Sequence, residues 1–295
     1  MKLFSSPLCG ISVLALGLIV SGASDAVART AGSCTMAGAV TAGDIITGES
    51  IQQGSTTNIN WNTLFGEGAG LLTCGDWNFQ GDFAHYGHTA NISGKDFSTP
   101  AGHFGADVFW RDQNVGDFGI SVSRITQSFV IRDMNTWRIG AAGNYFLNNQ
   151  VSFGLGAHYY TGNLNFGPSN KNTSGFEFSL GAKYYVTPDL NLTIDGDYLQ
   201  GHNTAGSFNS DTSSFAFTGK ANYQFFDQGL IGFLGGRLVR RTDSFSSGPN
   251  RLTNDNQIFA GLTFEFNGKP GSLVSHDRSG PISNTSTLLE IAPHF

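Results

Sequence analysis

The chain has few charged residues. Asp, Glu, Lys and Arg make up 13% of its 295 residues, about half the share found in ordinary soluble domains. The formal net charge is -6 at pH 7, so the chain offers no basic surface that would hold phosphates. A nucleic-acid partner is therefore not expected.

Long apolar runs are also missing. Beyond the N-terminal region, no segment approaches the ~18 uninterrupted apolar residues of a membrane-spanning helix. The one early run, Ile11 to Val20, follows Lys2 and precedes the small residues Ala26-Val27-Ala28. This order is typical of a secretory signal peptide, so we expect residues 1–28 to be removed on export. A chain of this kind can span a membrane only as a closed β-barrel, which indicates a Gram-negative bacterium.

Cysteines and catalytic motifs are scarce. Cys9 lies in the signal peptide, and we expect the remaining pair, Cys34 and Cys74, to form a disulfide in the exported chain. The sequence has no Cys-x-x-Cys, Gly-x-Ser-x-Gly, His-Glu-x-x-His or phosphate-loop motif. We therefore expect no metal, no cofactor and no enzyme activity. Solvated loop positions explain the acidic and histidine residues near the first loop better than a hydrolase site does: Asp82, His85, His88, Asp96, His103 and Asp107.

Glycine and phenylalanine are abundant, with 40 and 25 residues. This composition suits a wall with lipid on one side and a crowded lumen on the other, although a Gly-rich β-sandwich would share it. The segment 176–199 favours the wall, because its residues alternate with the period of two that strands show. Each of its two arms is about ten residues long, enough to span a bilayer when tilted. We interpret the segment as a hairpin of a transmembrane β-barrel.

The same alternation predicts an all-β, antiparallel, up-and-down barrel of about ten strands between residues 77 and 267, with eight to twelve strands remaining open. The expected strands are 77–87, 103–112, 117–128, 136–147, 150–160, 174–186, 190–200, 213–226, 230–240 and 256–267. Tight turns at one end are expected to alternate with long polar loops at the other, as in bacterial outer-membrane barrels. The expected long loops are 88–102, 161–173, 201–212 and 241–255.

The final strand carries the spacing Gly-x-x-aromatic-x-aromatic at Gly261, Phe264 and Phe266. This spacing resembles the terminal-strand signal of outer-membrane β-barrel proteins, with Phe259 where a polar residue is usual. In that family the barrel-insertion machinery recognises the terminal strand, so the resemblance implies an assembly signal. We expect residues 268–295, rich in Pro, Ser and Gly, to form a C-terminal periplasmic tail.

Residues 29–76 do not alternate. We predict either a loosely ordered periplasmic segment or a plug folded into the barrel mouth and tied by the Cys34–Cys74 disulfide.

The two faces of the predicted strands differ in chemistry. We expect the membrane to contact Phe153, Leu155, Phe178, Leu180, Leu192, Ile194, Phe217 and Leu262. Strand 230–240 is ambiguous, because either of its faces could point outward. We expect a paired polar network to line the lumen: Asp107, Arg111, Arg138, His158, Glu177, Lys183, Asp195, Asp197, Lys220 and Glu265.

Ten strands enclose a lumen closer to a filled barrel than to an aqueous channel. We therefore expect a porin-like or structural outer-membrane protein with at most a narrow or gated passage for small solutes. One alternative is a surface adhesion or ligand-binding barrel that acts through its outer loops, and a weaker one is an outer-membrane hydrolase. The expected partners are outer-membrane lipid and lipopolysaccharide, the insertion machinery and small solutes.

Overall fold

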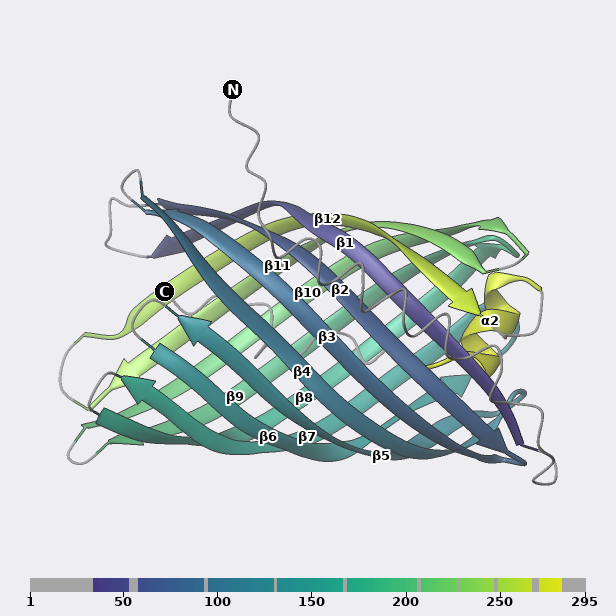
Figure 1. The fold of residues 1–295 in the computed structure, drawn as a ribbon, viewed down its shortest axis with the longest axis horizontal. Helices are drawn as coiled ribbons and strands as arrows, with labels where there is room; N and C mark the ends of the chain where they lie inside the picture. The colour runs from purple at the N-terminus through teal and green to yellow at the C-terminus, as the bar shows by residue number, and fades with distance from the viewer. Residues whose placement is uncertain are drawn as a thin grey trace.

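In a computed structural model the chain forms one closed antiparallel β-barrel of twelve strands (Figure 1). Each strand pairs with its neighbours in sequence, and β1 pairs with β12 to close the wall. The structure describes residues 34–52, 58–92, 95–129, 132–166, 169–205, 208–227, 229–246, 249–266 and 271–282. The predicted signal peptide, 1–28, lies outside these residues.

The strands are long. Their bounds are β1 Cys34–Gln52, β2 Asn58–Cys74, β3 Trp77–Ile92, β4 Lys95–Asp112, β5 Gly116–Phe129, β6 Arg132–Phe146, β7 Val151–Phe166, β8 Ser169–Thr187, β9 Leu190–Ala205, β10 Phe208–Phe226, β11 Leu230–Phe245 and β12 Arg251–Phe266. A short helix, α2, follows at Leu273–Ser279. Among the described residues, no helix is long and apolar enough to cross a membrane.

The barrel fold is confirmed, but the prediction of about ten strands is low by two. The prediction of a separate segment or plug at 29–76 is wrong for the residues the structure describes, because 34–52 and 58–74 are the barrel strands β1 and β2. Their alternation is hidden for two reasons. A register shift after Ile45 breaks the pattern in β1, and the outer face of β2 carries glycine at 66, 68 and 70, where lipid-facing strands usually show large apolar residues.

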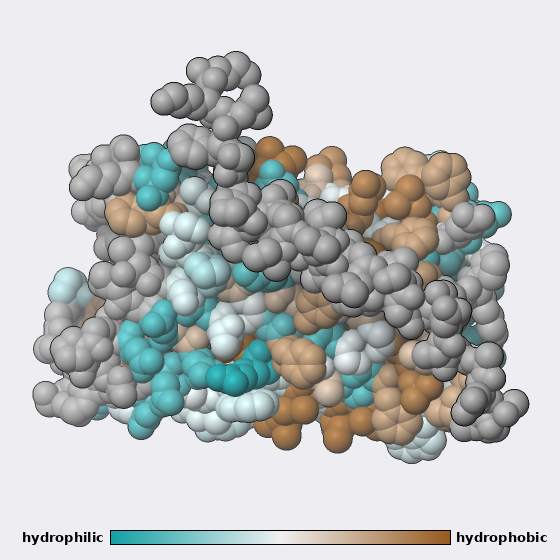
Figure 2. Space-filling view, viewed as in Figure 1, coloured by the Kyte–Doolittle hydropathy of each residue, from teal (hydrophilic) through white to brown (hydrophobic). Residues whose placement is uncertain are grey.

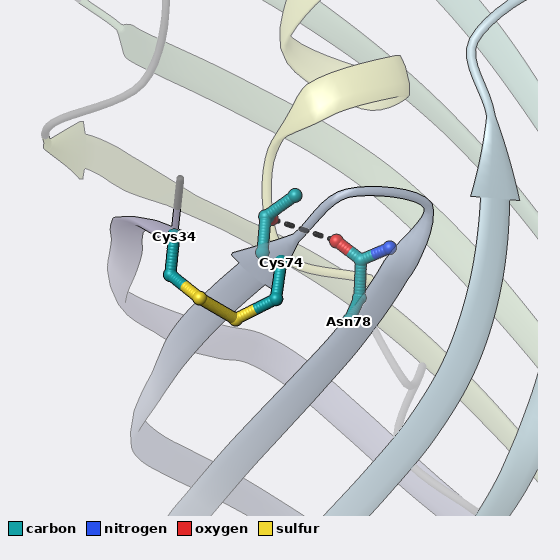
Figure 3. Close-up of a disulfide and its surroundings, with 4 residues drawn as sticks. Cys34, Cys74 and Asn78 are labelled. Carbon is teal, nitrogen blue, oxygen red and sulfur yellow. Dashed lines mark hydrogen bonds between the residues drawn. A yellow bond between two sulfur atoms is a disulfide. The ribbon is translucent and has the colours of Figure 1, made fainter. Parts of the chain in front are cut away.

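The predicted disulfide is present and joins the start of β1 to the end of β2 (Figure 3). Cys34 and Cys74 face each other as a cross-strand pair. On the next strand, Asn78 accepts a hydrogen bond of 2.7 Å from the Thr73 hydroxyl. The bridge therefore fastens one hairpin of the wall at its end and does not tie down a plug.

One end of the barrel has turns of two to four residues, and we call it the short-turn end. The predicted tight turns near 114, 148, 188 and 228 all lie there, joined by a turn at Gly75, which has a left-handed φ of 64°. The long loops predicted for the opposite, far end are wrong. The strands continue through most of 88–102, 161–173 and 201–212 and leave connections of two residues at 93–94, 167–168 and 206–207. Of the fourth predicted loop, 241–255, only 246–250 lies between β11 and β12.

The polar composition of those segments is compatible with strands because the ladder pairs the backbone groups and buried polar side chains such as His88, Thr99 and Thr212 occupy the inward face. Figure 2 agrees with this interpretation, since apolar residues on the visible face gather toward the α2 end and hydrophilic residues toward the far end. The strands therefore extend beyond the apolar band at the far end.

The outer face is apolar along this band. All of the predicted membrane-facing residues are exposed on it, from Phe153 at 43% to Leu180 at 67%. The ambiguous strand 230–240 is resolved by its exposure pattern: Leu234 and Leu238 face outward, and Ile231, Arg237 and Val239 face inward.

Candidate functional site

The lumen is the candidate site, because a large group of buried charged residues lies on its wall. All of the predicted lumen residues occupy inward positions, in step with fully buried neighbours on the same strands. The structure divides them into separate groups along the barrel.

The central group joins three neighbouring strands. Arg138 on β6 donates to Glu177 on β8 at 2.8 Å, and its Nη2 lies 2.9 Å from Nδ1 of His158 on β7. The arginine and glutamate side chains are 10% and 3% exposed. A buried charge pair with additional hydrogen bonds is the arrangement that tolerates removal from water.

A second group lies nearer the short-turn end. Arg111 on β4 and Asp117 on β5 approach to 3.7 Å, and Asn144 on β6 donates a 2.8 Å hydrogen bond to the same carboxylate. Asp107, on the same face of β4, accepts a contact of 3.4 Å from Gln80 on β3. These groups cross strand boundaries and fix the positions of neighbouring side chains.

Sequence reasoning missed several inward residues. Arg237 on β11 lies 3.7 Å from Asp197 and was hidden by the ambiguous facing of its strand. Asp82 and His103 had been assigned to a solvated loop, yet they face the lumen from β3 and β4 and approach to 3.0 Å. Both lie inside the predicted strands 77–87 and 103–112, so the period of two in those strands would already have placed them on the inward face.

Apolar side chains project into the lumen toward the far end. One buried cluster takes a residue from each of six strands: Ile125, Met134, Tyr160, Leu199, Ala216 and Val239. A barrel of twelve strands lies between the filled eight-stranded barrels and the open channels of sixteen or more. The cluster accordingly occupies part of the lumen at this level.

The short-turn mouth holds the described part of the predicted C-terminal tail. α2 lies at this end of the barrel (Figure 1), and Leu273, 2% exposed, packs against Tyr185 and Ile231 of the lumen wall. Asp277 pairs with the Lys183 ammonium at 2.8 Å and accepts a hydrogen bond from Tyr185 at 2.5 Å. The segment is thus docked onto inward-facing side chains.

Further contacts surround the same mouth. Arg278 donates to the carbonyl of Asn148 at 2.7 Å and stacks over the Phe146 ring. Beyond the helix, Arg111 donates to the carbonyl of Gly280 at 2.7 Å, and Gln80 bonds both the amide and the carbonyl of Ile282. Residues 271–282 therefore contact strands on several sides of the mouth, and we call this segment the mouth segment.

One residue of the mouth segment, His276, has a shifted pKa. His276 Nδ1 lies 2.6 Å from the carboxylate of Glu265 on β12. This hydrogen bond raises the pKa of His276 above its usual range, while burial opposes the shift. Protonation of His276 therefore strengthens the attachment of α2 to the wall.

The remaining predicted residues are also placed. Lys220 and Asp195 face the middle of the lumen, close enough for their charges to interact. Of the proposed assembly signal, Gly261 faces inward, Phe264 is 43% exposed on the outer face, and the Phe266 ring covers Gly38 of β1. Within the described residues, no cluster of His, Cys, Asp or Glu is arranged to hold a metal ion.

No protein-family model and no curated protein matches the chain. Among solved structures, an outer-membrane channel from Pseudomonas putida F1 is similar, with a TM-score of 0.51 and 15% identity over 80% of this chain and 98% of that chain. The translocator domain of the autotransporter NalP from Neisseria meningitidis gives a TM-score of 0.46 and 11% identity over 87% and 96% of the two chains. The Pseudomonas putida toluene transporter TodX gives 0.43 and 9% over 81% and 90%. The first of these likenesses shows that the chain has the fold of an outer-membrane β-barrel.

Proposed function

We propose that the protein is an outer-membrane channel with a narrow lumen for small solutes, closed at its short-turn mouth by the mouth segment. The observation that carries the proposal is the docking of 271–282 onto inward-facing residues of a closed barrel. In outer-membrane barrels the short turns lie in the periplasm, so closure would be on the periplasmic side.

The chemistry of the two wall faces supports this function. The outer face carries apolar residues such as Leu180 and Ile194, whereas the inner face carries Arg138, Glu177 and Lys220. A structural barrel would not need an interior of paired charges, since an apolar filling is often as stable. Adhesion through long outer loops loses its support, because the segments chosen for it are mostly strand.

Single-channel recording of refolded residues 29–295 in a planar bilayer tests the proposal. The double variant Leu273→Ala/Asp277→Ala removes the apolar and ionic contacts of α2 with Tyr185 and Lys183. We expect the native protein to open rarely and the double variant to open at least tenfold more often. Ser279→Ala is the matched control, because its hydroxyl donates only within the helix, to the Ser275 carbonyl.

Folded, inserted protein that never conducts, in native and double-variant form alike, would contradict a channel. Equal opening of the native protein and the double variant would contradict closure by the mouth segment.

A further inference from the structure

Three phenylalanine rings lie in a row on the inner wall, over glycines of β1, β12 and β11. Phe65 on β2 and Phe233 on β11 lie with ring centroids 6.3 Å apart and planes at 29°. Phe259 on β12 continues the row, 6.3 Å from Phe233. All three rings are partly exposed, and we call them the phenylalanine platform.

Glycines make room for these rings. Gly43 on β1 and Gly261 on β12 face each other across the strand pair. A Cβ at Gly43 would overlap the Phe65 ring, and a Cβ at Gly261 would overlap the Phe233 ring. Gly235 accommodates Phe259 in the same way. The Phe65, Phe233 and Phe259 rings therefore lie over glycine backbone of the inner wall.

Polar groups of both signs surround the platform. The Lys220 ammonium lies 5.8 Å from the centre of the Phe233 ring, and its charge interacts with those of Asp195 and Glu67. Tyr86 holds Glu67 through a 2.7 Å hydrogen bond. On the inner wall beside the platform, the hydroxyls of Thr41 and Thr263 lie 2.9 Å apart. The rim thus combines carboxylates, an ammonium and hydroxyls.

This combination selects one class of solute. A purely apolar solute would remove water from the carboxylates and the ammonium without replacing its hydrogen bonds, which is costly. An anionic ring would meet Glu67 and Asp195. A saccharide has an apolar C–H face that can lie on aromatic rings, and hydroxyls at its edge that both donate and accept hydrogen bonds.

We propose that the phenylalanine platform is a binding surface for neutral saccharides passing through the lumen. The inference rests on the proposed channel function and names its solute class. The sugar ring stacks on Phe65 and Phe233, its hydroxyls donate to Glu67 and Asp195, and the Lys220 ammonium donates to a hydroxyl oxygen.

Calorimetric titration of refolded residues 29–295 in detergent with maltotriose tests the site, with benzoate and toluene as competing solute classes. We expect saturable binding of maltotriose in the millimolar range, as is usual for a solute that must also leave. Phe233→Ala should weaken it about tenfold, because one stacking face is lost, whereas Phe233→Tyr should retain it. Lys220→Met, which keeps a similar length without the charge, should also weaken it.

The control is Phe178→Ala, which removes a ring that is 49% exposed on the outer face and should leave binding unchanged. Absence of saturable maltotriose binding would overturn the inference, as would equal binding by native protein and Phe233→Ala. Tighter binding of benzoate or toluene would overturn the saccharide assignment.

Conductance recorded from the same preparations separates the two proposals. A protein that conducts but does not bind maltotriose would support the channel and contradict the saccharide site. A protein that binds maltotriose through Phe233 but does not conduct would contradict the channel and support the saccharide site.

Discussion

Arg138 illustrates how single residues keep charge stable inside this barrel. Its guanidinium contacts a carboxylate and an imidazole from two neighbouring strands, so the charge is neutralised and hydrogen-bonded at once. The facing of Arg138, Glu177 and His158 could be predicted from the period of two in each strand. Their partners could not, because the pairing depends on the register between strands, which a single strand's pattern does not determine.

Removing one member of the Arg138–Glu177 pair should destabilise the folded barrel more than removing both. Glu177→Ala leaves the Arg138 guanidinium buried without its carboxylate, and such losses typically cost about 3–5 kcal/mol. The double variant Arg138→Met/Glu177→Leu leaves no buried charge and should cost much less. Urea unfolding of the inserted barrel, followed by tryptophan fluorescence, measures both. A double variant as unstable as Glu177→Ala, or less stable, would show that a stranded Arg138 charge is not what destabilises the single variant.

Two elements, the β1–β2 hairpin and α2, differ most from the sequence-based predictions. The hairpin is a pair of barrel strands although its outer face is rich in glycine, because neighbouring rings cover the gaps. Phe83 of β3 lies over Gly68, and Phe266 of β12 lies over Gly38. Contacts of this kind join distant parts of the chain, so no local pattern in residues 29–76 could reveal them.

The disulfide should stabilise the hairpin without affecting the passage. Replacing both cysteines, as Cys34→Ser/Cys74→Ser, opens a loop with a sequence separation of 40, for which chain entropy predicts a loss of about 3–4 kcal/mol. Thermal or urea unfolding should show this loss, while single-channel conductance stays at the native value. A rise in conductance on losing the bridge would instead support a plug tied by these cysteines.

α2 should respond to pH through His276. The groups that face its ring are Glu265 on β12, Asp277 on α2 and the backbone of Asp227 in the β10–β11 turn. Docking raises the pKa of His276, so the extra stability of the docked state is fully present below the free value of about 6.5 and is lost as pH rises through the docked value.

Openings should accordingly become more frequent as pH rises above the free value of about 6.5 and through the higher docked value of His276. Single-channel recording at several pH values measures this, with His276→Gln as the comparison, since it keeps a hydrogen-bonding side chain that does not titrate. The same pH dependence in His276→Gln would assign the effect to another group.

At the scale of the whole molecule, the sequence allowed us to predict which residues face outward and which face inward. It did not allow us to predict how far the strands extend. Each membrane-facing residue named from the sequence is exposed on the outer face. The far-end segments contain Asn, Ser and Gly, which suggest loops, yet they continue as strands beyond the apolar band. Paired backbone groups satisfy one another there, so the residues need no apolar face.

A charged side chain in the middle of the apolar band of the outer face should prevent stable insertion into a membrane. Leu180 and Leu192 are 67% and 45% exposed, and arginine at either position places a charge in lipid at a cost of roughly 2–4 kcal/mol. Leu180→Arg/Leu192→Arg should therefore fail to insert stably into vesicles. Ser179→Arg, on the inward face of the same strand, should still insert, and normal insertion of the double variant would contradict the facing assigned here.

The central claim is that solutes pass through the lumen and not around the barrel. Its most direct test is single-channel current from Lys220→Cys in a Cys34→Ser/Cys74→Ser background, recorded before and after addition of a charged thiol reagent. Lys220 faces the lumen, and Ile194, 53% exposed on the outer face, provides the matched Ile194→Cys control. We predict a stepwise fall in current for Lys220→Cys and no change for Ile194→Cys. A current that survives modification at Lys220→Cys, or no current from inserted protein in any form, would contradict the account.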